Sequence, residues 1–408
     1  MAQKQARDHQ GPEYAPEYYV GLISGTSVDG IDAVVIESNG NHSRLSAQSS
    51  ELTLDNKPNI IATKCFQIPS SLQKQIHALC HDDSLTPDSL NQTTGPVAET
   101  HQALGLLLAS GAKEIIAQAG IRNADVIAIG SHGQTIKHQP PTDKAQGYSL
   151  QIGCAKTIAA ETGITTISDF RNADMRNGGQ GAPLAPAFHR LIAPKDLRCC
   201  VFLNLGGIAN ISVVDQQQAL LGYDTGPANT LMDAWIQHCK QQAFDRSGEW
   251  ARSGKVNESL LNLCLEEAYF QIAAPKSTGR ELFNLKWLEK RLQRLDTRPV
   301  DADVQATLLF LSALTISNEI DKLSARPQAV YCCGGGSHNT ALTNQLQMLM
   351  PDIVIDTTNT LGIHVDYVEA ALFAWLAKKH IHGESVDLQA VTGASQPTLL
   401  GEREHARA

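Results

Sequence analysis

The stretch Tyr18-Tyr-Val-Gly-Leu-Ile-Ser-Gly-Thr-Ser-Val-Asp-Gly-Ile-Asp-Ala-Val-Val-Ile-Glu37 decides the fold class, and the other motifs of the chain can be interpreted from it. Two β-branched apolar runs, Tyr19–Ile23 and Ile31–Ile36, flank the small polar segment Ser24–Gly30. This pattern predicts a β-hairpin whose connection is rich in glycine and hydroxyl residues. Because consecutive backbone N–H groups in such a connection form a concave anion site, the hairpin is predicted to hold an anionic group. The alternative is an ordinary hairpin turn.

The unit of a buried strand followed by glycines returns twice further along the chain. Cys200–Val214 again has two apolar runs, here joined by Gly206-Gly207, and the buried strand Ala329–Cys333 is followed by Gly334–Gly336. Such a repeat predicts two similar halves that face each other. Strands and helical segments alternate between the repeats, which predicts an α/β fold with mixed sheets.

Hydrophobic periodicity predicts the remaining elements. Strands are expected at Ile60–Ile68, Asp125–Gly130, Leu150–Gly153, Thr165–Ser168, Leu220–Asp224 and Ile353–Asp356. Helices are expected at Leu72–His81, Gly95–Gly120, Cys154–Thr162, Asn229–Lys240, Asn257–Phe270, Leu285–Leu295, Val304–Leu323 and Tyr367–His380. Thr278-Gly-Arg-Glu281 matches a capping box that would start the helix at Leu285–Leu295. Residues 401–408 are expected to be frayed.

Length and composition limit the class of protein. The chain has 408 residues, of which 42% are hydrophobic, and its formal net charge is −9. This length predicts two domains, and the acidic balance provides no overall positive field for nucleic acid or anionic lipid. No apolar run reaches the ~18 residues that a membrane span needs. Nine cysteines without a C-x-x-C pair predict free thiols in a reducing compartment.

The expected organisation follows from these observations. The polar residues 1–16 are unlike a signal peptide and are expected to form a disordered arm. A first domain is expected at 17–195 and a second at 196–376, with a helix within 377–400 as a candidate to return to the first domain. We expect a cytoplasmic protein that binds neither nucleic acid nor membrane.

Residues Ser168–Ala187 show no periodicity and are expected to form a long loop. The segment carries Asp169, Arg171, Asp174 and Arg176 between its glycines and prolines. Long loops in compact domains are usually functional or disordered, and these charged residues favour a function. The alternative is a flexible linker between domains.

Two common nucleotide-binding patterns are absent from the sequence. It contains neither G-x-x-x-x-G-K-[ST] nor G-x-G-x-x-G, which disfavours a P-loop NTPase and a Rossmann dehydrogenase.

The three glycine turns resemble the phosphate-1, phosphate-2 and adenosine motifs of the actin, Hsp70 and sugar-kinase superfamily. Seven motifs together, from about Tyr18 to Leu400, resemble the anhydro-N-acetylmuramic acid kinase family: Ser24-Gly-Thr-Ser-x-Asp-Gly30, Gly130-Ser-His-Gly-Gln-Thr135, Asp169-Phe-Arg with Gly178-Gly-Gln-Gly-Ala-Pro-Leu184, Asn204-Leu-Gly-Gly207, Gly222-Tyr-Asp-Thr-Gly-Pro227, Lys276-Ser-Thr-Gly-Arg-Glu281 and Cys333-Gly-Gly-Gly336. One position departs from the family pattern, because Ala228 stands where a glycine is usual.

The resemblance implies two RNase H-like domains that clamp ATP with Mg²⁺ in a central cleft. It implies hydrolytic opening of the 1,6-anhydro ring of anhydro-N-acetylmuramic acid with phosphorylation of O6, in peptidoglycan recycling, and a homodimer. Two alternatives stay open: another kinase of this fold that acts on a hexose or on acetate, and a non-catalytic ATP-dependent clamp.

The nucleotide is assigned to the glycine motifs. The triphosphate is expected at Gly25, Thr26, Ser27, Val28, Asp29, Gly30, Ile31 and Asp32, with Gly206 and Gly207 at the β- or γ-phosphate and Gly334, Gly335 and Gly336 at the adenosine. Asp29 is expected to hold a water of Mg²⁺ rather than the ion itself. The direct metal ligands stay unknown. Ordinary structural turns are the alternative at each glycine motif.

Asp224 is the predicted base that activates water at C1 of the sugar. It lies at a strand end before a helix, and a helix N-terminus favours the ionised carboxylate that a base requires. The alternative is an Asp that only serves the helix entry. The expected sugar ligands are His132, Gln134, Asp169, Arg171, Asp174 and Glu369. An arginine is expected to bind the lactyl carboxylate, and the sequence does not decide which.

Overall fold

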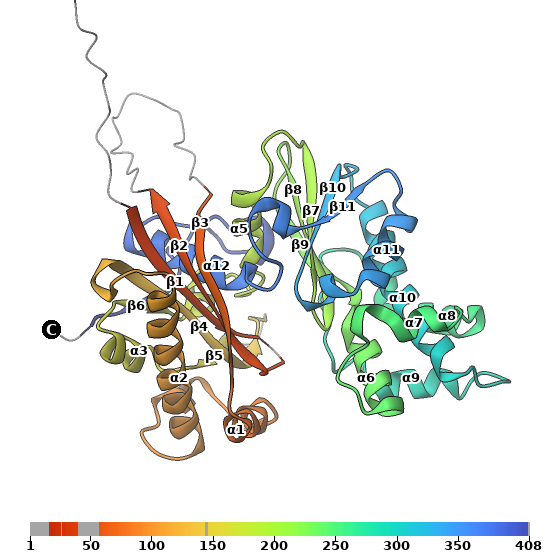
Figure 1. The fold of residues 1–408 in the computed structure, drawn as a ribbon, viewed down its shortest axis with the longest axis horizontal. Helices are drawn as coiled ribbons and strands as arrows, with labels where there is room; N and C mark the ends of the chain where they lie inside the picture. Colours follow the sequence, from red (N-terminus) through yellow and green to blue (C-terminus); the bar gives the residue numbers. More distant parts are fainter. Residues whose placement is uncertain (1–15, 26, 40–56, 143–145, 407–408) are drawn as a thin grey trace, which may run out of the picture.

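The computed structural model describes residues 16–25, 27–39, 57–142 and 146–406. Two lobes, each built on its own sheet, lie side by side (Figure 1). Nearly all of the arm expected at residues 1–16 lies outside the described residues, as does Thr26. The strand β1 already includes Pro16.

The first sheet contains the predicted hairpin. Its strands, in the spatial order β12-β6-β4-β1-β2-β3 with β5 paired to β4, are β1 (Pro16–Ser24), β2 (Gly30–Asn39), β3 (Asn59–Gln67), β4 (Val126–Gln139), β5 (Tyr148–Ile152), β6 (Thr166–Ser168) and β12 (Glu402–Glu404). The helices α1 (Ser70–Cys80), α2 (Pro96–Gln118) and α3 (Ala155–Thr162) belong to this half. Alternate residues of the hairpin, such as Val20, Leu22 and Ile31, share an apolar cluster with these helices.

The second sheet is built in the same way. Its strands, in the order β11-β10-β7-β8-β9, are β7 (Cys199–Leu205), β8 (Ile208–Asp215), β9 (Leu221–Pro227), β10 (Ala329–Cys333) and β11 (Val354–Thr357). The helices of this half are α6 (Asn229–Lys240), α7 (Glu249–Ser253), α8 (Glu258–Leu265), α9 (Leu285–Leu292), α10 (Asp301–Asp321) and α11 (Thr340–Leu349). A second apolar cluster joins this sheet to its helices.

The two sheets repeat one topology. In the first, β2 is antiparallel to β1 and β3, while β4 is parallel to β1 and β6 is parallel to β4. In the second sheet, β8 is likewise antiparallel to β7 and β9, while β10 is parallel to β7 and β11 is parallel to β10. This repeat confirms the predicted α/β fold with two similar halves and mixed sheets.

The last helix of each half packs against the sheet of the other half. Helix α5 (Ala185–Ile192) stacks His189 on Phe202 of β7, with ring centroids 4.6 Å apart. Helix α12 (Val368–Ile381) crosses the first sheet at Gly21 and Gly130, where a side chain would overlap the backbone of the helix. Both helices lie between the sheets (Figure 1), in one shared apolar cluster. The boundary expected at 376 falls inside α12, and the division into two RNase H-like domains stays a prediction.

The segment Ser168–Ala187 was expected to be a loop, and this prediction is wrong. It contains helix α4 (Phe170–Arg176), and α5 begins at Ala185. Seven residues make fewer than two helical turns, so α4 is too short to show a periodic apolar face.

Three other expectations about elements are corrected. The motif that follows Gly130 was expected after a strand but lies inside β4, which continues to Gln139. Helix α9 does not begin at the expected capping box, because its N-cap is Asn284, whose side chain accepts the N–H of Trp287. Residues 402–404 are not frayed, since they pair with β6 as β12.

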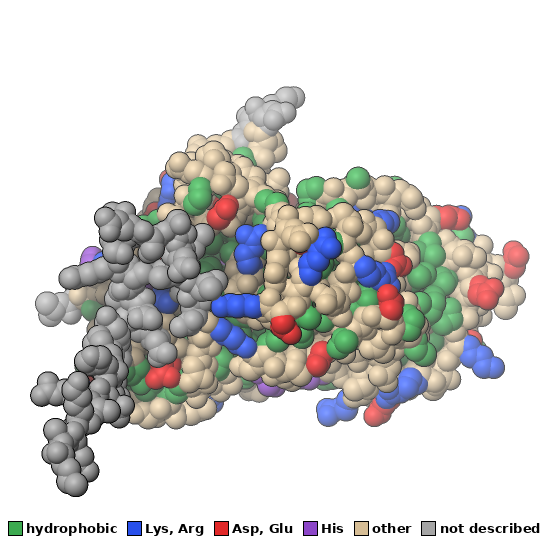
Figure 2. Space-filling model, turned by 90° about the horizontal axis from the view of Figure 1, so that it is seen from above, with side chains coloured by type: hydrophobic (Ala, Val, Ile, Leu, Met, Phe, Trp, Pro, Cys, Tyr) green, Lys and Arg blue, Asp and Glu red, His purple; other side chains and the backbone are tan. Residues whose placement is uncertain are grey.

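The surface and the cysteines complete the description. Acidic and basic side chains are interspersed in the middle of the face seen in Figure 2. Within the described ranges, no helix has the length and apolar character needed to cross a membrane. All nine cysteines are free thiols, and five of them (Cys199, Cys200, Cys264, Cys332 and Cys333) are buried.

Candidate active site

The connection between β1 and β2 is a strained turn anchored in the core. The N–H of Val28 donates to the carbonyl of Gly25 at 3.0 Å. Val28 has a φ of 58°, which is unfavourable for a β-branched residue, yet its side chain is buried in the apolar cluster of the first half. Ser24 donates its hydroxyl to Gln134 Oε1 at 2.6 Å, which ties the hairpin to β4.

The turn Gly206–Gly207 is tied to the N-terminus of α6. The carbonyl of Gly206 accepts the N–H of Asn229, and that of Gly207 accepts the N–H groups of Ala228 and Thr230. Ala228 has a φ of −107° and a ψ of −97°, a combination outside the α and β regions that L-residues favour, so the departure from the family pattern falls at an unfavourable backbone conformation.

The third glycine run packs against the second. A side chain at Gly334 would overlap Asn204, and a Cβ at Gly336 would lie 2.7 Å from the carbonyl oxygen of Leu205. Because β7 and β10 are parallel neighbours, their carboxyl ends meet at one edge of the sheet. The hydroxyl of Ser337, just after this run, is buried and has no hydrogen-bond partner among the described residues. The structure therefore brings two of the three predicted nucleotide motifs together.

Acidic side chains from the two halves meet between the hairpin and the third glycine run. His338 Nε2 lies 3.0 Å from both carboxylate oxygens of Asp366, in the segment before α12. Burial raises the pKa of Asp32 on β2 to about 6; a hydrogen bond with Cys65 lowers it, and the carboxylates of Asp366, Asp29 and Glu369 raise it further. The first and third glycine motifs thus face a common group of carboxylates.

Glu369 lies at the junction of the two halves. Its side chain is exposed to solvent, yet surrounding protein raises the pKa of its carboxyl, while the charge of Arg171 lowers it. The same carboxylate adds to the burial that raises the pKa of Cys333 at the end of β10. The electrostatic influence on Arg171 and Cys333 places Glu369 near the junction of the two halves, and its contact with a sugar stays a prediction.

Asp224 is held at the end of β9. The N–H of Thr278 donates to its Oδ2 at 3.0 Å, and the hydroxyl of Tyr269 donates to its backbone carbonyl at 2.7 Å. Burial raises the pKa of Asp224 to about 6; the hydrogen bond from Thr278 lowers it, and the charge of Glu281 raises it. The second carboxylate oxygen, Oδ1, accepts no hydrogen bond in the described part of the chain.

The direction of the Asp224 side chain follows from strand alternation. Residues two apart on a strand share one face, so Asp224 lies on the face of Gly222. A Cβ at Gly222 would lie 2.9 Å from Pro186 and 3.4 Å from Pro183, both from the first half. Asp224 therefore lies on the sheet face that contacts the first half at Gly222.

Arg171 is the centre of the predicted sugar ligands in the first half. Its Nε donates to His132 Nε2 at 3.0 Å and its Nη1 to the carbonyl of Gly181 at 2.9 Å. His132 stacks on Phe373 of α12, and burial, together with the charge of Arg171, lowers the pKa of His132 well below its usual value. The neutral ring accepts from Arg171 and therefore fixes its direction. Nη2 of Arg171 has no partner among the described residues.

The other predicted sugar ligands have protein partners. Asp174 accepts the N–H of Gly181 and the hydroxyl of Thr392, both at 2.8 Å. Asp169 accepts the side-chain amide of Asn172 at 2.6 Å. Gln134, as described above, braces the hairpin. These contacts give the three side chains a role in holding the segment, and their contact with a sugar stays a prediction.

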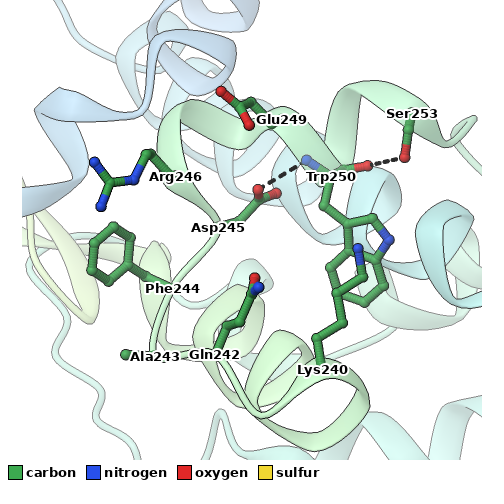
Figure 3. A pocket seen from close by; sticks show the side chains of 9 residues that line it. All are labelled: Lys240, Gln242, Ala243, Phe244, Asp245, Arg246, Glu249, Trp250 and Ser253. Carbon is green, nitrogen blue, oxygen red and sulfur yellow. Dashed lines mark hydrogen bonds between the residues drawn. The ribbon is translucent and has the colours of Figure 1, made fainter.

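Two hollows of the surface lie away from these residues. One, of 640 Å³, lies between the end of α6 and α7, where Figure 3 shows Lys240 over Trp250 on one side and Phe244 with Arg246 on the other. The other, of 680 Å³, borders Tyr223, Ile272 and Glu319. Neither is lined by a predicted nucleotide or sugar residue. Across the described ranges, no hydrogen bond or ion pair joins Asp224 to the first hairpin.

No metal centre is preformed in the described part of the chain, where no group of three or more His, Cys, Asp or Glu side chains could hold an ion. Mg²⁺ typically binds through substrate phosphates, several waters and one or two carboxylates. Asp29 and Asp32, beside the first turn, could supply the one or two carboxylates of such a site. Two carboxylates are too few to hold the ion without phosphates and waters.

Two residues beside the site were not predicted as site residues, Thr278 and Arg280. Both belong to the motif Lys276–Glu281, which was interpreted as a helix start. Thr278 holds Asp224, and the guanidinium of Arg280 lies against Gly207. The signal in the sequence was the motif Lys276–Glu281 itself. Helix α9 does not need this motif as a cap, because Asn284 is its N-cap.

By its fold the chain is an α/β protein with glycine turns at the ends of two sheets of the same topology. More narrowly, the chain belongs to the anhydro-N-acetylmuramic acid kinase family, whose model matches residues 17–405. It is therefore a kinase with an alcohol group as acceptor and a small-molecule sugar as substrate. The family resemblance of the motifs is confirmed.

Relatives with this family name cover the whole length. The chain is 44% identical to the anhydro-N-acetylmuramic acid kinase of Shewanella sp. (strain ANA-3), over 96% of this chain and 99% of the relative. It is also 44% identical to that of Shewanella amazonensis, over 94% and 98%.

Solved structures are more distant. A ROK hexokinase from Thermus thermophilus has 16% identity and a TM-score of 0.34 over 89% of this chain and 99% of that chain. A ROK family glucokinase from Streptomyces griseus in complex with glucose and AMPPNP has 13% identity and a TM-score of 0.36 over the same shares. These similarities are weak, and the family assignment depends on the sequence matches.

Proposed function

We propose that the protein is an ATP-dependent kinase that opens the 1,6-anhydro ring of 1,6-anhydro-N-acetylmuramic acid with water and phosphorylates O6. The products are N-acetylmuramic acid 6-phosphate and ADP, in peptidoglycan recycling. Relatives that bear this name match almost the whole chain. The observation that carries the proposal is the carboxylate of Asp224, held by Thr278 at the end of β9, on the sheet face that contacts the first half at Gly222.

Asp224 acts as the general base. Its pKa of about 6 leaves it mostly ionised at neutral pH while making it a stronger base than an ordinary carboxylate. Thr278 occupies Oδ2, so Oδ1 accepts the proton of the attacking water. The water oxygen then bonds to C1, the bond from C1 to O6 breaks, and O6 takes the γ-phosphoryl group as ADP leaves.

The nucleotide lies along the three glycine motifs. The turn at Gly25–Asp32 and the turn Gly206–Gly207 hold the phosphates, and Gly334–Gly336 approach the adenosine. The close packing of Gly336 on Leu205 leaves no room for a side chain there, which supports a backbone surface for a flat ligand. Mg²⁺, when bound with ATP, neutralises charge on the phosphates.

Arg171 binds the lactyl carboxylate of the sugar. It is directed by His132 and by Gly181, and its Nη2 is left for a ligand. Arg176 is less suited, because it already pairs with Asp169 at 3.5 Å and with Glu402 at 3.1 Å. A planar guanidinium matches the two oxygens of a carboxylate.

The test is the fate of water oxygen. Wild-type protein incubated with ATP, Mg²⁺ and the anhydro sugar in ¹⁸O-water should give a phosphorylated product labelled at C1, found by mass spectrometry. The release of ADP should also depend on the presence of the sugar.

The two alternatives give other results. A kinase for a hexose or acetate would phosphorylate its acceptor without taking up label, and a non-catalytic clamp would show the same ATPase rate with and without the sugar. Either result would refute the proposal.

A homodimer and a cytoplasmic location are proposed from the family alone.

A further inference from the structure

The segment Lys276–Glu281 connects the predicted base to the second glycine turn. The carbonyl of Lys276 accepts the N–H of Asp224, and Thr278 donates to the carboxylate of Asp224. Two residues further on, Arg280 reaches Gly207. One short non-helical stretch therefore touches both the water-activating group and the turn assigned to phosphate.

Gly207 is a glycine because Arg280 covers it. A Cβ at Gly207 would lie 3.0 Å from both Nε and Nη2 of Arg280. Gly207 is absent from the residues with positive φ, so backbone conformation does not demand a glycine there. Any side chain at this position would displace the guanidinium.

The Arg280 guanidinium is uncommitted in the structure. The side chain is exposed, and within the described ranges it makes no hydrogen bond or ion pair. Arg280 acts electrostatically on Asp233 of α6: burial raises the pKa of Asp233 to about 7, while the charge of Arg280 lowers it and that of Asp245 raises it. Asp233 is therefore partly protonated near neutral pH and compensates the arginine charge only in part.

The backbone of the turn offers further donors. The carbonyls of Gly206 and Gly207 accept N–H groups from α6, whereas the N–H groups of the two glycines have no acceptor in the part of the chain that the structure describes. Free amides beside a free guanidinium form a site for a multiply charged oxyanion such as phosphate. The neighbouring carboxylates Asp224 and Glu281 cannot serve such an anion.

We infer that Arg280 binds the terminal phosphate of ATP at the Gly206–Gly207 turn and stabilises it during transfer to O6. This inference rests on the proposed function and adds a catalytic residue to it. Arg280 donates hydrogen bonds only, and keeps its protons throughout. Because Arg280 follows Thr278 by two residues, the segment fixes the distance between the bound phosphate and the base Asp224.

The test compares Arg280→Gln with Arg280→Lys and with the control Arg294→Gln, an exposed arginine of the same half that pairs with Glu266. Arg280→Gln should lower kcat for the sugar-dependent release of ADP by about 100-fold. Arg280→Lys should recover part of the loss, because it keeps the charge without the planar fork. Arg294→Gln should behave as wild type.

Calorimetry supplies a readout that needs no turnover. In Arg280→Gln, the Kd for AMPPNP should rise about tenfold, which is the loss of one charged hydrogen-bonded contact. The Kd for ADP, which lacks the terminal phosphate, should stay within about twofold of wild type by the same reasoning. A merely structural role would weaken both nucleotides and lower the Tm.

The outcomes separate the two proposals. Equal effects on AMPPNP and ADP, or kcat within about threefold of wild type, overturn the role of Arg280 while the kinase stands. A wild-type protein without sugar-dependent turnover refutes the proposed function, and the nucleotide measurements still decide the role of Arg280. If Arg280→Gln does not fold, Arg280→Lys carries the same comparison between the two nucleotides.

Discussion

The first and second halves share a sheet topology but differ in the turn that follows their first strand. In the first half, the turn at Ser24–Gly30 is long, strained at Val28 and lined by carboxylates. In the second, Gly206–Gly207 is a two-residue turn covered by the cation of Arg280. The repeated fold thus carries opposite charge beside its two corresponding turns. The difference indicates that one turn suits a metal-bound phosphate and the other a bare phosphate oxygen.

The largest effect is expected from removing Asp224, the proposed base, from the second half. Asp224→Asn keeps the size and the hydrogen bond from Thr278 but cannot take a proton, so kcat should fall about 1,000-fold. Steady-state ADP release measures the loss, and the Kd for ADP should be unchanged. Asp296→Asn, an exposed carboxylate elsewhere in the same half, is the control. Near-normal turnover of Asp224→Asn would contradict the assignment.

The junction between the halves should be the most sensitive part of the scaffold. In the first half, Gly130 lets α12 touch the strand backbone, whereas the second half meets α5 through side chains such as His189 and Phe202. Gly130→Ala should therefore lower the free energy of unfolding by about 3 kcal/mol, because the helix must move away. Urea unfolding measures it.

The control for this prediction is Gly335→Ala. Gly335 has open space where a Cβ would lie, and its φ is not positive. The stability of this variant should match wild type within about 0.5 kcal/mol. Equal losses in both variants would show that the contact with α12 is not responsible.

The pH dependence should distinguish the acidic groups of the two halves. Burial raises the pKa of Asp224 and that of Asp32 to about 6. Because a base acts only when ionised, kcat/KM should fall about tenfold per pH unit below pH 6. In Asp32→Asn this acidic limb should persist if Asp224 causes it. Loss of the limb in that variant would assign it to the first half.

The smallest effect is expected at the strained turn of the first half. Val28→Gly loses a buried side chain but relieves a positive φ, so its free energy of unfolding should fall by only about 1 kcal/mol. Val34→Gly removes the same atoms from a fully buried strand position without that relief and should cost about 2 kcal/mol more. Equal losses in urea unfolding would show that the turn stores no strain.

Local patterns were sufficient for the long strands and helices and for the repeat of the two halves. The hairpin strands, the second and third glycine units and helix α6 all lie where periodicity and glycine placement predict them. Long periodic segments carry enough apolar positions to state which face is buried. Helix α4 and strand β12 were missed, because seven and three residues respectively carry too few positions.

Some of the proposed site residues could be found from local sequence patterns, and others only from the structure. Asp224 could be chosen from the sequence because its motif and its place at a strand end are local properties. The hydrogen bond from Thr392 to Asp174 could not be predicted, since Thr392 lies far along the chain. Arg280 was hidden in an apparent helix start, and only its approach to Gly207 identified it.

The sequence by itself determined the family and the repeated strand-and-glycine plan, and it proposed Asp224 as the base, because these depend on neighbours along the chain. Only the tertiary structure decided that each half lends its last helix to the other sheet, that Arg171 is directed by His132, and that a cation covers one glycine turn while carboxylates surround the other. Contacts of this kind join residues far apart in the chain, and their geometry depends on how two folded halves pack rather than on any local pattern.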